Sequence, residues 1–443
     1  MKFDNALQEW LTRKIIFTQQ PAEDNRILAE HLAIGEEILA SLSAKSNRTS
    51  SEQRVAKQVH DCSRTLRRQF LSLHAEWLYN SLTAQGTMPK RISELIYEAS
   101  EKCPGLVPTR TQIADELRHP QKHKEEREID QGLLLQSWLA HPGIAVRLFH
   151  AMLRPTRRAV ELLERFEQDG KVVLKTASLQ RDHAAGHITI HNLSCLNAED
   201  NQLVEDLETV VDLVLLSPSI KVGVLRGGIM THPRYAGRRV FSAGINLKDL
   251  NDGKISFLDF LIRREFGFIS KIMRGLRPEQ AALADMGPFL DLQKPWLAVV
   301  DAFAIGGGAQ LLLAFDRVIA TPDSFISLPA AQEGIVPGFS NLRLTRAMGA
   351  RIARQIILFG RKIWATELAG SLIVDEVVEA ASMEDAMARN INDLCSPAVI
   401  ANRHMLNLSE EPLESMRHYA VDFALVQAIR LYSPDVLNKA RFA

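Results

Sequence analysis

The sequence predicts an α/β fold preceded by an all-helical N-terminal region. Apolar residues recur at every third or fourth position from Val55 to Trp77, which is typical of one face of a long helix. From Val172 to Asn192 apolar and polar residues instead alternate with a period of two, as expected of strands. The stretch from Lys294 to Gly338 then indicates strand, glycine turn, helix and strand in succession. Strands interleaved with helices favour an α/β core beside a separate helical domain.

The length and composition are those of an ordinary soluble globular protein. The chain has 443 residues, of which 46% are hydrophobic and 24% charged, enough for two or three domains. Its 53 basic and 53 acidic residues give zero formal net charge, which argues against a nucleic-acid partner. No apolar run approaches the ~18 to 20 residues of a membrane span. Residues Met1 to Trp10 do not form a secretory signal, so we expect a cytoplasmic protein.

Three segments are expected along the chain. The helical N-terminal domain takes residues 1–175, the α/β core takes residues 176–400, and a final helical segment takes residues 401–443. Within the first segment, Ser50 with Gln53 forms a capping signal at the start of the long helix.

A run of three glycines marks the first candidate site. Leu297 to Ile305 is an apolar strand pattern, and the good helix formers Ala309 to Phe315 follow the glycines. Gly306, Gly307 and Gly308 therefore stand at a helix N-terminus, where backbone N–H groups lack partners and the helix dipole favours a negative oxygen.

A second turn lies upstream, between Arg238 and Leu250. Here Val240 and Phe241 are interpreted as the end of a strand, followed by a turn that leaves the N–H of Ile245 unpaired. Two unpaired N–H groups that face one point form an oxyanion hole, which stabilises an enolate or a tetrahedral oxyanion. Each glycine turn by itself is weak evidence, because three glycines before a helix more often reflect only close packing of the helix on a strand.

The two turns together have a specific resemblance. The motifs FSAGINL, IGGGAQLLLAFDRVIA and FISLPAAQEGIVPG, in this order, resemble those of the crotonase (enoyl-CoA hydratase) superfamily over residues 185–400. The resemblance implies a crotonase-type spiral of ββα units, an acyl-CoA thioester substrate, and assembly into a homotrimer or a hexamer built as a dimer of trimers. The final helical segment would then cover the active site or the trimer interface.

The resemblance also assigns roles to individual residues. It implies an oxyanion hole made by the N–H groups of Ile245 and Gly307. The substrate-binding positions beside these two residues are Ala243, Gly244, Asn246 and Gly306.

Two departures from the family pattern argue against hydration of a double bond. Hydratases of this family carry one glutamate two residues after the glycine run and another after the proline of the FISLP-type strand. Those positions hold Gln310 and Ala330 in this sequence. Neither side chain abstracts a proton or activates water.

Further residues narrow the resemblance to one branch of the superfamily. Gln310, Arg264 in RREFG, Glu199 in LNAED and the long helical N-terminus resemble the branch that oxidises 3,5-dihydroxyphenylacetyl-CoA with dioxygen. This implies formation of 3,5-dihydroxyphenylglyoxylate and CoA with no metal, flavin, haem or other cofactor. The reaction would serve dihydroxyphenylglycine supply in antibiotic biosynthesis. Alternatives are a crotonase-type hydrolase or decarboxylase, and a non-catalytic assembly protein.

Within this hypothesis Glu199, Arg264 and Gln310 orient ring hydroxyls or the incipient peroxide, and Ile335 helps to line an apolar recess for dioxygen. We expect Arg264 to hold a ring hydroxyl directly, because a buried arginine needs an anionic or multi-acceptor partner. A salt bridge from Arg264 to Glu265 is the structural alternative, and Glu199 is equally well explained as a glutamate near a helix N-terminus.

No metal site is predicted. The histidines His183, His187 and His191 are four residues apart, a spacing that gathers ligands on a helix face, whereas this stretch has a strand pattern. They are interpreted as surface or hairpin residues.

Overall fold

The computed structural model describes residues 2–277 and 292–440, and its chain divides into two compact units. The first unit comprises Met1–Leu148, Asn251–Lys254 and Ala420–Ser433, and the second comprises Phe149–Leu250, Ile255–Tyr419 and Pro434–Ala443. Each unit is described separately.

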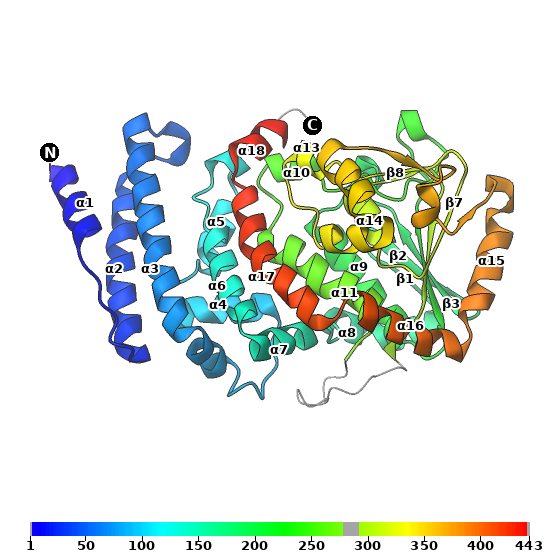
Figure 1. Ribbon diagram of the computed structural model, residues 1–443, viewed down its shortest axis with the longest axis horizontal. Coiled ribbons are helices and arrows are strands. Elements are labelled where there is room, and N and C mark those ends of the chain that lie inside the picture. Colours follow the sequence, from blue (N-terminus) through cyan, green and yellow to red (C-terminus); the bar gives the residue numbers. More distant parts are fainter. Residues whose placement is uncertain (1, 278–291, 441–443) are drawn as a thin grey trace. The chain divides into compact units, whose positions relative to one another are not determined.

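The first unit is helical throughout its described residues, and α2 and α3 lie side by side (Figure 1). Its interior is apolar, with Leu28, Phe70 and Trp138 fully buried. The helices up to the boundary are α1 (Lys2–Thr12), α2 (Pro21–Ser41), η1 (Lys45–Asn47), α3 (Ser50–Leu82), α4 (Ile92–Lys102), α5 (Arg110–Glu116), η2 (Gln121–His123), α6 (Glu128–Ala140) and α7 (Pro142–Met152).

The N-cap of the long helix α3 lies one residue before the predicted one. Thr49 is the N-cap, and its hydroxyl accepts the Glu52 N–H at 3.2 Å while the Glu52 carboxylate accepts the Thr49 N–H at 2.8 Å. This reciprocal pair is a capping box, so the predicted pair of Ser50 and Gln53 was wrong by one position.

The second unit contains two sheets. The larger has the strand order β1-β2-β3-β4-β5-β7-β10, antiparallel among the first three strands and parallel from β3 to β10. The smaller has the order β6-β8-β9. The strands are β1 (Lys171–Val173), β2 (Ala177–Asp182), β3 (Ala185–Ile190), β4 (Val222–Gly227), β5 (Trp296–Val300), β6 (Phe303–Ile305), β7 (Arg317–Ala320), β8 (Phe325–Ser327), β9 (Ile363–Trp364) and β10 (Glu376–Val377).

Successive strand pairs contribute to both sheets. β5, β7 and β10 extend the larger sheet, while β6, β8 and β9 form the smaller one, with helices between the pairs. The predicted single strand from Leu297 to Ile305 is therefore two strands, separated by a turn at Asp301 and Ala302. This turn brings the end of β6 and the glycine run to the edge of the smaller sheet.

Helices of the second unit cover the larger sheet and connect its strands. Apolar residues of β4, β5 and β7 pack against Met383 and Met387 of α15 on one side, and α9 contacts β2 and β4. The helices are α8 (Arg157–Asp169), η3 (Leu193–Cys195), α9 (Asn201–Leu216), η4 (Pro233–Tyr235), α10 (Leu247–Asn251), η5 (Phe257–Ile269), α11 (Ser270–Arg274), α12 (Gly307–Leu312), α13 (Ala330–Glu333), α14 (Ser340–Phe359), η7 (Gly370–Leu372), η8 (Ala380–Ser382), α15 (Met383–Leu394), α16 (Pro397–Glu410), α17 (Leu413–Arg430) and α18 (Pro434–Ala440).

The two compact units differ from the three segments expected from the sequence. Helix α8 was expected in the N-terminal domain but belongs to the second unit, where Arg158 pairs with Asp206 of α9 at 2.9 Å. Helix α17 is divided between the units at Tyr419. A helical pattern alone does not reveal which neighbour a helix packs against, and this explains the difference.

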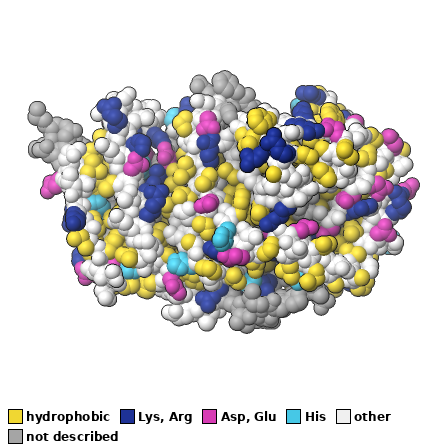
Figure 2. Space-filling model, in the orientation of Figure 1, with side chains coloured by type: hydrophobic (Ala, Val, Ile, Leu, Met, Phe, Trp, Pro, Cys, Tyr) yellow, Lys and Arg dark blue, Asp and Glu magenta, His cyan; other side chains and the backbone are white. Residues whose placement is uncertain are grey.

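Charges of both signs are visible on the face shown in Figure 2, with Lys and Arg side chains gathered over the region of α14. Arg346, Arg351 and Arg354 of α14 are exposed. Basic and acidic side chains are therefore not evenly mixed over this face. None of the helices within residues 2–277 and 292–440 is both long and apolar enough to cross a membrane.

Candidate active site

A short parallel bridge between Glu199 and Ile245 orients the first of the two glycine turns. The Glu199 N–H donates to the Gly244 carbonyl at 2.6 Å, and the Asn246 N–H donates to the Glu199 carbonyl at 2.8 Å. In such a parallel bridge the neighbours of Ile245 make the hydrogen bonds, so the N–H of Ile245 itself points to the opposite side. Val240 and Phe241 lie outside any strand, although Ser242 bridges to Ala304 of β6.

The second turn presents its own N–H beside the first. Gly307 is the first residue of α12, and the preceding Gly306 has a φ of 52°, a conformation that glycine adopts without strain. The turns are in contact, because a Cβ added to Gly244 would lie 3.5 Å from the Gly307 nitrogen. Neither the Ile245 N–H nor the Gly307 N–H has an acceptor among the described residues.

These two residues line a small cavity of about 30 Å³. Its polar lining comes from Glu199, Arg264, Glu265, Gln310 and Glu333. The remaining lining residues are glycines and apolar side chains, namely Ile245, Phe260, Leu261, Gly306, Gly307, Leu328, Ala330, Ile335, Val336, Pro337 and Gly338. A volume of this size holds about one small molecule such as water or dioxygen.

Arg264 is 3% exposed, and acceptors within the protein engage all five of its N–H groups. Its Nε donates to Glu199 Oε2 at 2.5 Å, and its Nη2 donates to Glu199 Oε1 at 3.2 Å and to the Gly307 carbonyl at 2.7 Å. Its Nη1 donates to Glu265 Oε1 at 2.7 Å and to Gln310 Oε1 at 2.8 Å. The sequence-based hypothesis was that Arg264 holds a ring hydroxyl directly, but its guanidinium has no vacant donor for one. The structural alternative, a salt bridge to Glu265, is present.

The two carboxylates outweigh the effect of burial on this arginine. Burial by itself lowers the pKa of Arg264, but Glu199 and Glu265 hold the pKa above its ordinary value. Arg264 is thus a permanent cation that fixes the side chains around it. The Glu199 carboxylate is held against the Cα of Gly307, since a Cβ there would lie 2.5 Å from Oε1.

The helix that carries Arg264 is anchored away from the cavity. The helix, η5, has π-type turns, which are common at functional sites. Arg263, the residue before Arg264, points to α9, where its Nε donates to Glu208 Oε2 at 2.6 Å. Lys271 of α11 lies in the same buried cluster, with its ammonium 2.8 Å from Glu208 and 2.7 Å from Asp212. The arginine pair is thereby separated, with one member on each side of the helix.

The ion pairs continue beyond the cavity as a row of alternating charges. Arg343 Nη1 lies 3.8 Å from Glu265 Oε2, and Arg343 Nε donates to Glu411 at 2.9 Å. Arg274 Nη2 is 3.1 Å from the same glutamate. Burial raises the pKa of Glu411, but the two arginines have the larger opposite effect and lower the pKa to about 2. In order the row is Glu199, Arg264, Glu265, Arg343, Glu411 and Arg274, three acids and three bases.

The structure brings together most of the predicted site residues. Those predicted residues that line the cavity are Glu199, Ile245, Arg264, Gly306, Gly307, Gln310 and Ile335. Ala243, Gly244 and Asn246 do not line it. The amide of Asn246 instead accepts the Asp249 N–H at 3.1 Å and donates to the Asp249 carboxylate at 2.8 Å, which caps α10.

Sequence reasoning did not assign a site role to two glutamates in the lining. Glu265 is 2% exposed, and its carboxylate also accepts the Phe339 N–H at 3.2 Å. An acid inside the apolar stretch from Phe257 to Ile269 was the available signal. Glu333 stands three residues after Ala330 in the predicted motif, and this spacing was its signal.

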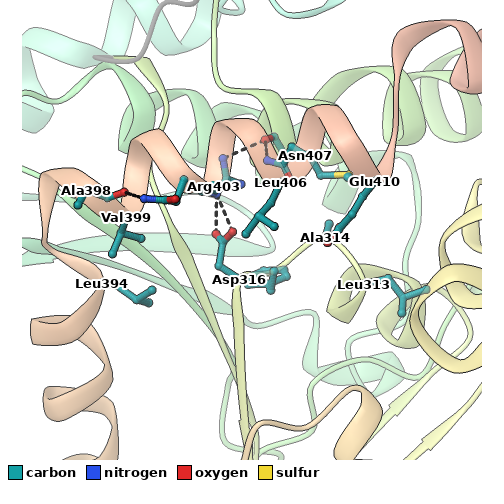
Figure 3. Close-up of a pocket in the computed structure, with 13 residues that line it drawn as sticks. Leu313, Ala314, Asp316, Leu394, Ala398, Val399, Arg403, Leu406, Asn407 and Glu410 are labelled. Carbon is teal, nitrogen blue, oxygen red and sulfur yellow. Dashed lines mark hydrogen bonds and ion pairs between the residues drawn. The ribbon is translucent and has the colours of Figure 1, made fainter.

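A larger hollow of about 460 Å³ lies beside α16 and has a different character (Figure 3). Two of its charged residues neutralise each other, since Arg403 Nε contacts both carboxylate oxygens of Asp316 at 2.7 Å. Asp316 also accepts the Trp296 N–H at 2.8 Å. Neither Ile245 nor Gly307 lines this hollow, so the smaller cavity is the candidate active site. Among the residues described, no three His, Cys, Asp or Glu side chains are grouped to hold a metal ion.

Comparison with known proteins identifies the family of the chain. The model of the enoyl-CoA hydratase/isomerase family matches residues 278–423. The (3,5-dihydroxyphenyl)acetyl-CoA 1,2-dioxygenase of Amycolatopsis orientalis is 48% identical over 419 residues, which are 95% of each chain. The short-chain-enoyl-CoA hydratase of Clostridium acetobutylicum is 25% identical over 57% of this chain and 86% of its own.

The solved structure of Pseudomonas aeruginosa OdaA covers 61% of this chain and 98% of its own, with a TM-score of 0.50 and 19% identity. At that identity the likeness concerns the fold alone. The family predicted from the glycine-turn motifs is confirmed by the full-length similarity to the Amycolatopsis protein. This chain is a member of the enoyl-CoA hydratase/isomerase family, with a crotonase fold preceded by a helical N-terminal region.

Proposed function

We propose that the protein is a dioxygenase that oxidises 3,5-dihydroxyphenylacetyl-CoA to 3,5-dihydroxyphenylglyoxylate and releases CoA. The observation that carries this proposal is the 48% identity over 95% of both chains to a dioxygenase of that name. The cavity supports it, because Gln310 and Ala330 line it, and the motif resemblance implies that hydratases of this family have their two glutamates at these positions.

The reaction balances without a further reactant. Loss of one α-proton gives an enolate, whose α-carbon bonds to dioxygen and forms a peroxide. The distal peroxide oxygen attacks the thioester carbon and expels CoA thiolate. The second α-hydrogen then leaves as a proton while the O–O bond breaks, giving the ketone and the carboxylate. Both oxygen atoms of dioxygen end in the product, and the enolate supplies the electrons.

The residues of the cavity have distinct tasks in this scheme. The N–H groups of Ile245 and Gly307 hold the thioester oxygen as it becomes an enolate oxygen, because charge-assisted hydrogen bonds strengthen as the charge develops. Arg264 fixes Glu199 and Gln310 around the reacting carbon. The apolar wall at Leu328, Ile335 and Val336 provides a recess suited to dioxygen.

The finer parts of the proposal concern cofactors, assembly and cell compartment. The enzyme works without a metal or organic cofactor, forms a homotrimer or a dimer of trimers as crotonases do, and acts in the cytoplasm. Its product feeds dihydroxyphenylglycine formation for antibiotic biosynthesis.

An oxygen electrode tests the proposal. The purified enzyme, exhaustively treated with EDTA, is mixed with 3,5-dihydroxyphenylacetyl-CoA, and oxygen uptake and free CoA thiol are recorded together. The proposal predicts equal amounts of oxygen consumed and CoA released, and no CoA release under argon. CoA release under argon indicates a hydrolase instead, and loss of activity that returns with added iron or copper contradicts the cofactor-free mechanism.

A further inference from the structure

The turn that presents the Ile245 N–H, residues 240–246, belongs to no strand and precedes the short helix α10. It contains only two isolated bridges, from Ser242 to Ala304 and from Ile245 to Glu199. The Ile245 N–H can hold the thioester oxygen of the proposed function only if this turn keeps one conformation. A role inferred for a residue that holds the turn therefore rests on the proposed function.

A second loop, residues 196–199, lies along this turn and ends in the bridge at Glu199. The Leu196 carbonyl accepts the Ala243 N–H at 3.1 Å. Leu196 and Asn197 both adopt the left-handed conformation, with φ of 55° and 57°. Residues other than glycine keep this conformation only where the surrounding contacts enforce it. Two such residues in succession, directly before a glutamate of the cavity, point to a functional constraint on the loop.

The side chain of Asn197 contacts the start of the turn. Its Nδ2 donates to the Val240 carbonyl at 2.7 Å, and both residues are 0% exposed. A Cβ added to Gly227 would overlap with the same carbonyl oxygen, so the end of β4 closes that side. Within residues 2–277 and 292–440, Asn197 is the only donor to this carbonyl. A buried carbonyl without a donor is unfavourable, so removal of the amide favours a movement of the turn.

We propose that Asn197 is a positioning residue for the oxyanion hole. Its amide holds the start of the turn at Val240 and the bridge of Glu199 holds the end, so that the Ile245 N–H stays directed at the thioester oxygen. Asn197 does not line the cavity, so it acts on the enolate oxygen only through Ile245. Asparagine meets both requirements, because it adopts a positive φ more readily than most residues and its amide carries a donor.

The test reads the polarisation of the thioester carbonyl. The enzyme binds 3,5-dihydroxyphenylacetyl-CoA under argon, with and without ¹³C at the thioester carbonyl, and the difference infrared spectrum gives the C=O stretching frequency. Hydrogen bonds from an oxyanion hole lower this frequency below that of the free thioester. Glycine adopts the φ of Asn197 without strain, so Asn197→Gly isolates the loss of the amide. The lowering on binding should shrink by about half or more in this variant, because one of the two N–H groups is no longer held in place.

Oxygen uptake supplies the second readout. Removal of a whole oxyanion-hole donor costs about 10² to 10³ in kcat, so Asn197→Gly should lower kcat by roughly 10- to 100-fold and change KM little. Asn407→Ala is the matched control, because Asn407 Nδ2 also donates to a distant backbone carbonyl, that of Met273, at 2.6 Å. Both residues belong to the same unit, and neither lines the candidate active site. This control should keep the wild-type frequency and kcat.

Asn197→Ser keeps a donor with a shorter reach, should change both readouts in the same direction, and decides the question if the glycine variant does not fold. A folded Asn197→Gly, or Asn197→Ser in its place, with the wild-type frequency and kcat overturns the role of Asn197. An equal loss in Asn407→Ala also overturns it. A lowered frequency in a wild type that takes up no oxygen contradicts the proposed function and leaves the role of Asn197 standing. Oxygen uptake by a wild type with no lowered frequency contradicts the role of Asn197 alone.

Discussion

Substitution of Arg264 by Lys should damage stability and activity together, because the guanidinium makes five hydrogen bonds to four residues. A lysine ammonium has three donors that radiate from one atom, so at least two of these contacts are lost. The acceptors left behind are buried, since Glu199 and Glu265 are each 2% exposed.

The expected magnitude follows from the number of bonds. A hydrogen bond to a charged group contributes about 1.5 to 3 kcal/mol, so the loss of two lowers the unfolding free energy by roughly 3 kcal/mol or more. If displacement of the Glu199 carboxylate from Gly307 raises the activation free energy by a similar amount, about 3 kcal/mol, kcat/KM falls by about 10². The loss should be equal with 3,5-dihydroxyphenylacetyl-CoA and with phenylacetyl-CoA, because no donor of Arg264 is left for a ring hydroxyl.

The neighbouring residue supplies a matched control. The side chain of Arg263 is 22% exposed, and it makes one short contact to Glu208 and a longer one, of 3.7 Å, to Glu205. Arg263→Lys keeps a donor for Glu208 and gives up fewer contacts, so it should lower the unfolding free energy by less than Arg264→Lys does and leave kcat/KM within a few-fold. Urea denaturation and oxygen-electrode kinetics on both substrates measure these quantities.

Two results would refute the reasoning. If Arg264→Lys matches Arg263→Lys in stability and rate, the five contacts do not organise the cavity. If the loss is confined to the dihydroxylated substrate, Arg264 contacts the ring after all, as the sequence-based hypothesis had it.

Three further predictions concern other parts of the site. Crotonyl-CoA should not be hydrated, because Gln310 and Ala330 replace both hydratase glutamates; absorbance of the enoyl thioester measures this, and a rate typical of a hydratase would contradict it. Gly307→Ala should reduce kcat/KM about 100-fold in oxygen-uptake assays, because the methyl group would lie 2.5 Å from Glu199 Oε1, and a loss below tenfold would show that the carboxylate can move. Glu411 has its pKa lowered to about 2, so its ion pairs stabilise the fold above pH 4.5 and lose this contribution, about 3 kcal/mol, as the pH falls to 2. Glu411→Gln should therefore be less stable than the wild type at neutral pH, with the difference shrinking between pH 4.5 and 2 in denaturation curves; a constant difference would contradict the assignment.

The parts of the site that follow from local sequence could be predicted. The glycine run and the helix after it predicted a helix N-terminus, and the helix begins at Gly307. The upstream turn predicted an unpaired N–H at Ile245, although the parallel bridge from Glu199 that directs this group was not foreseen. Both features depend on residues near one another in the chain.

Contacts between distant segments account for what the sequence did not reveal. The partners of Arg264 come from three separate stretches, so a sequence pattern could require a partner for the buried charge but could not choose between the ring of a substrate and Glu199, Glu265 and Gln310 together. Glu333, which also lines the cavity, was overlooked because α13 is only four residues long, too short for a periodic pattern to show which of its faces turns inward.

Isotopic labelling of dioxygen tests the central claim most directly. The enzyme is given 3,5-dihydroxyphenylacetyl-CoA under ¹⁸O2 in unlabelled water, and the product is reduced immediately with borohydride so that the ketone oxygen cannot exchange. Mass spectrometry should find both labelled atoms in the reduced arylglyoxylate, one at the former ketone and one in the carboxylate. An unlabelled arylacetate, or a carboxylate whose new oxygen comes from water, would contradict the account.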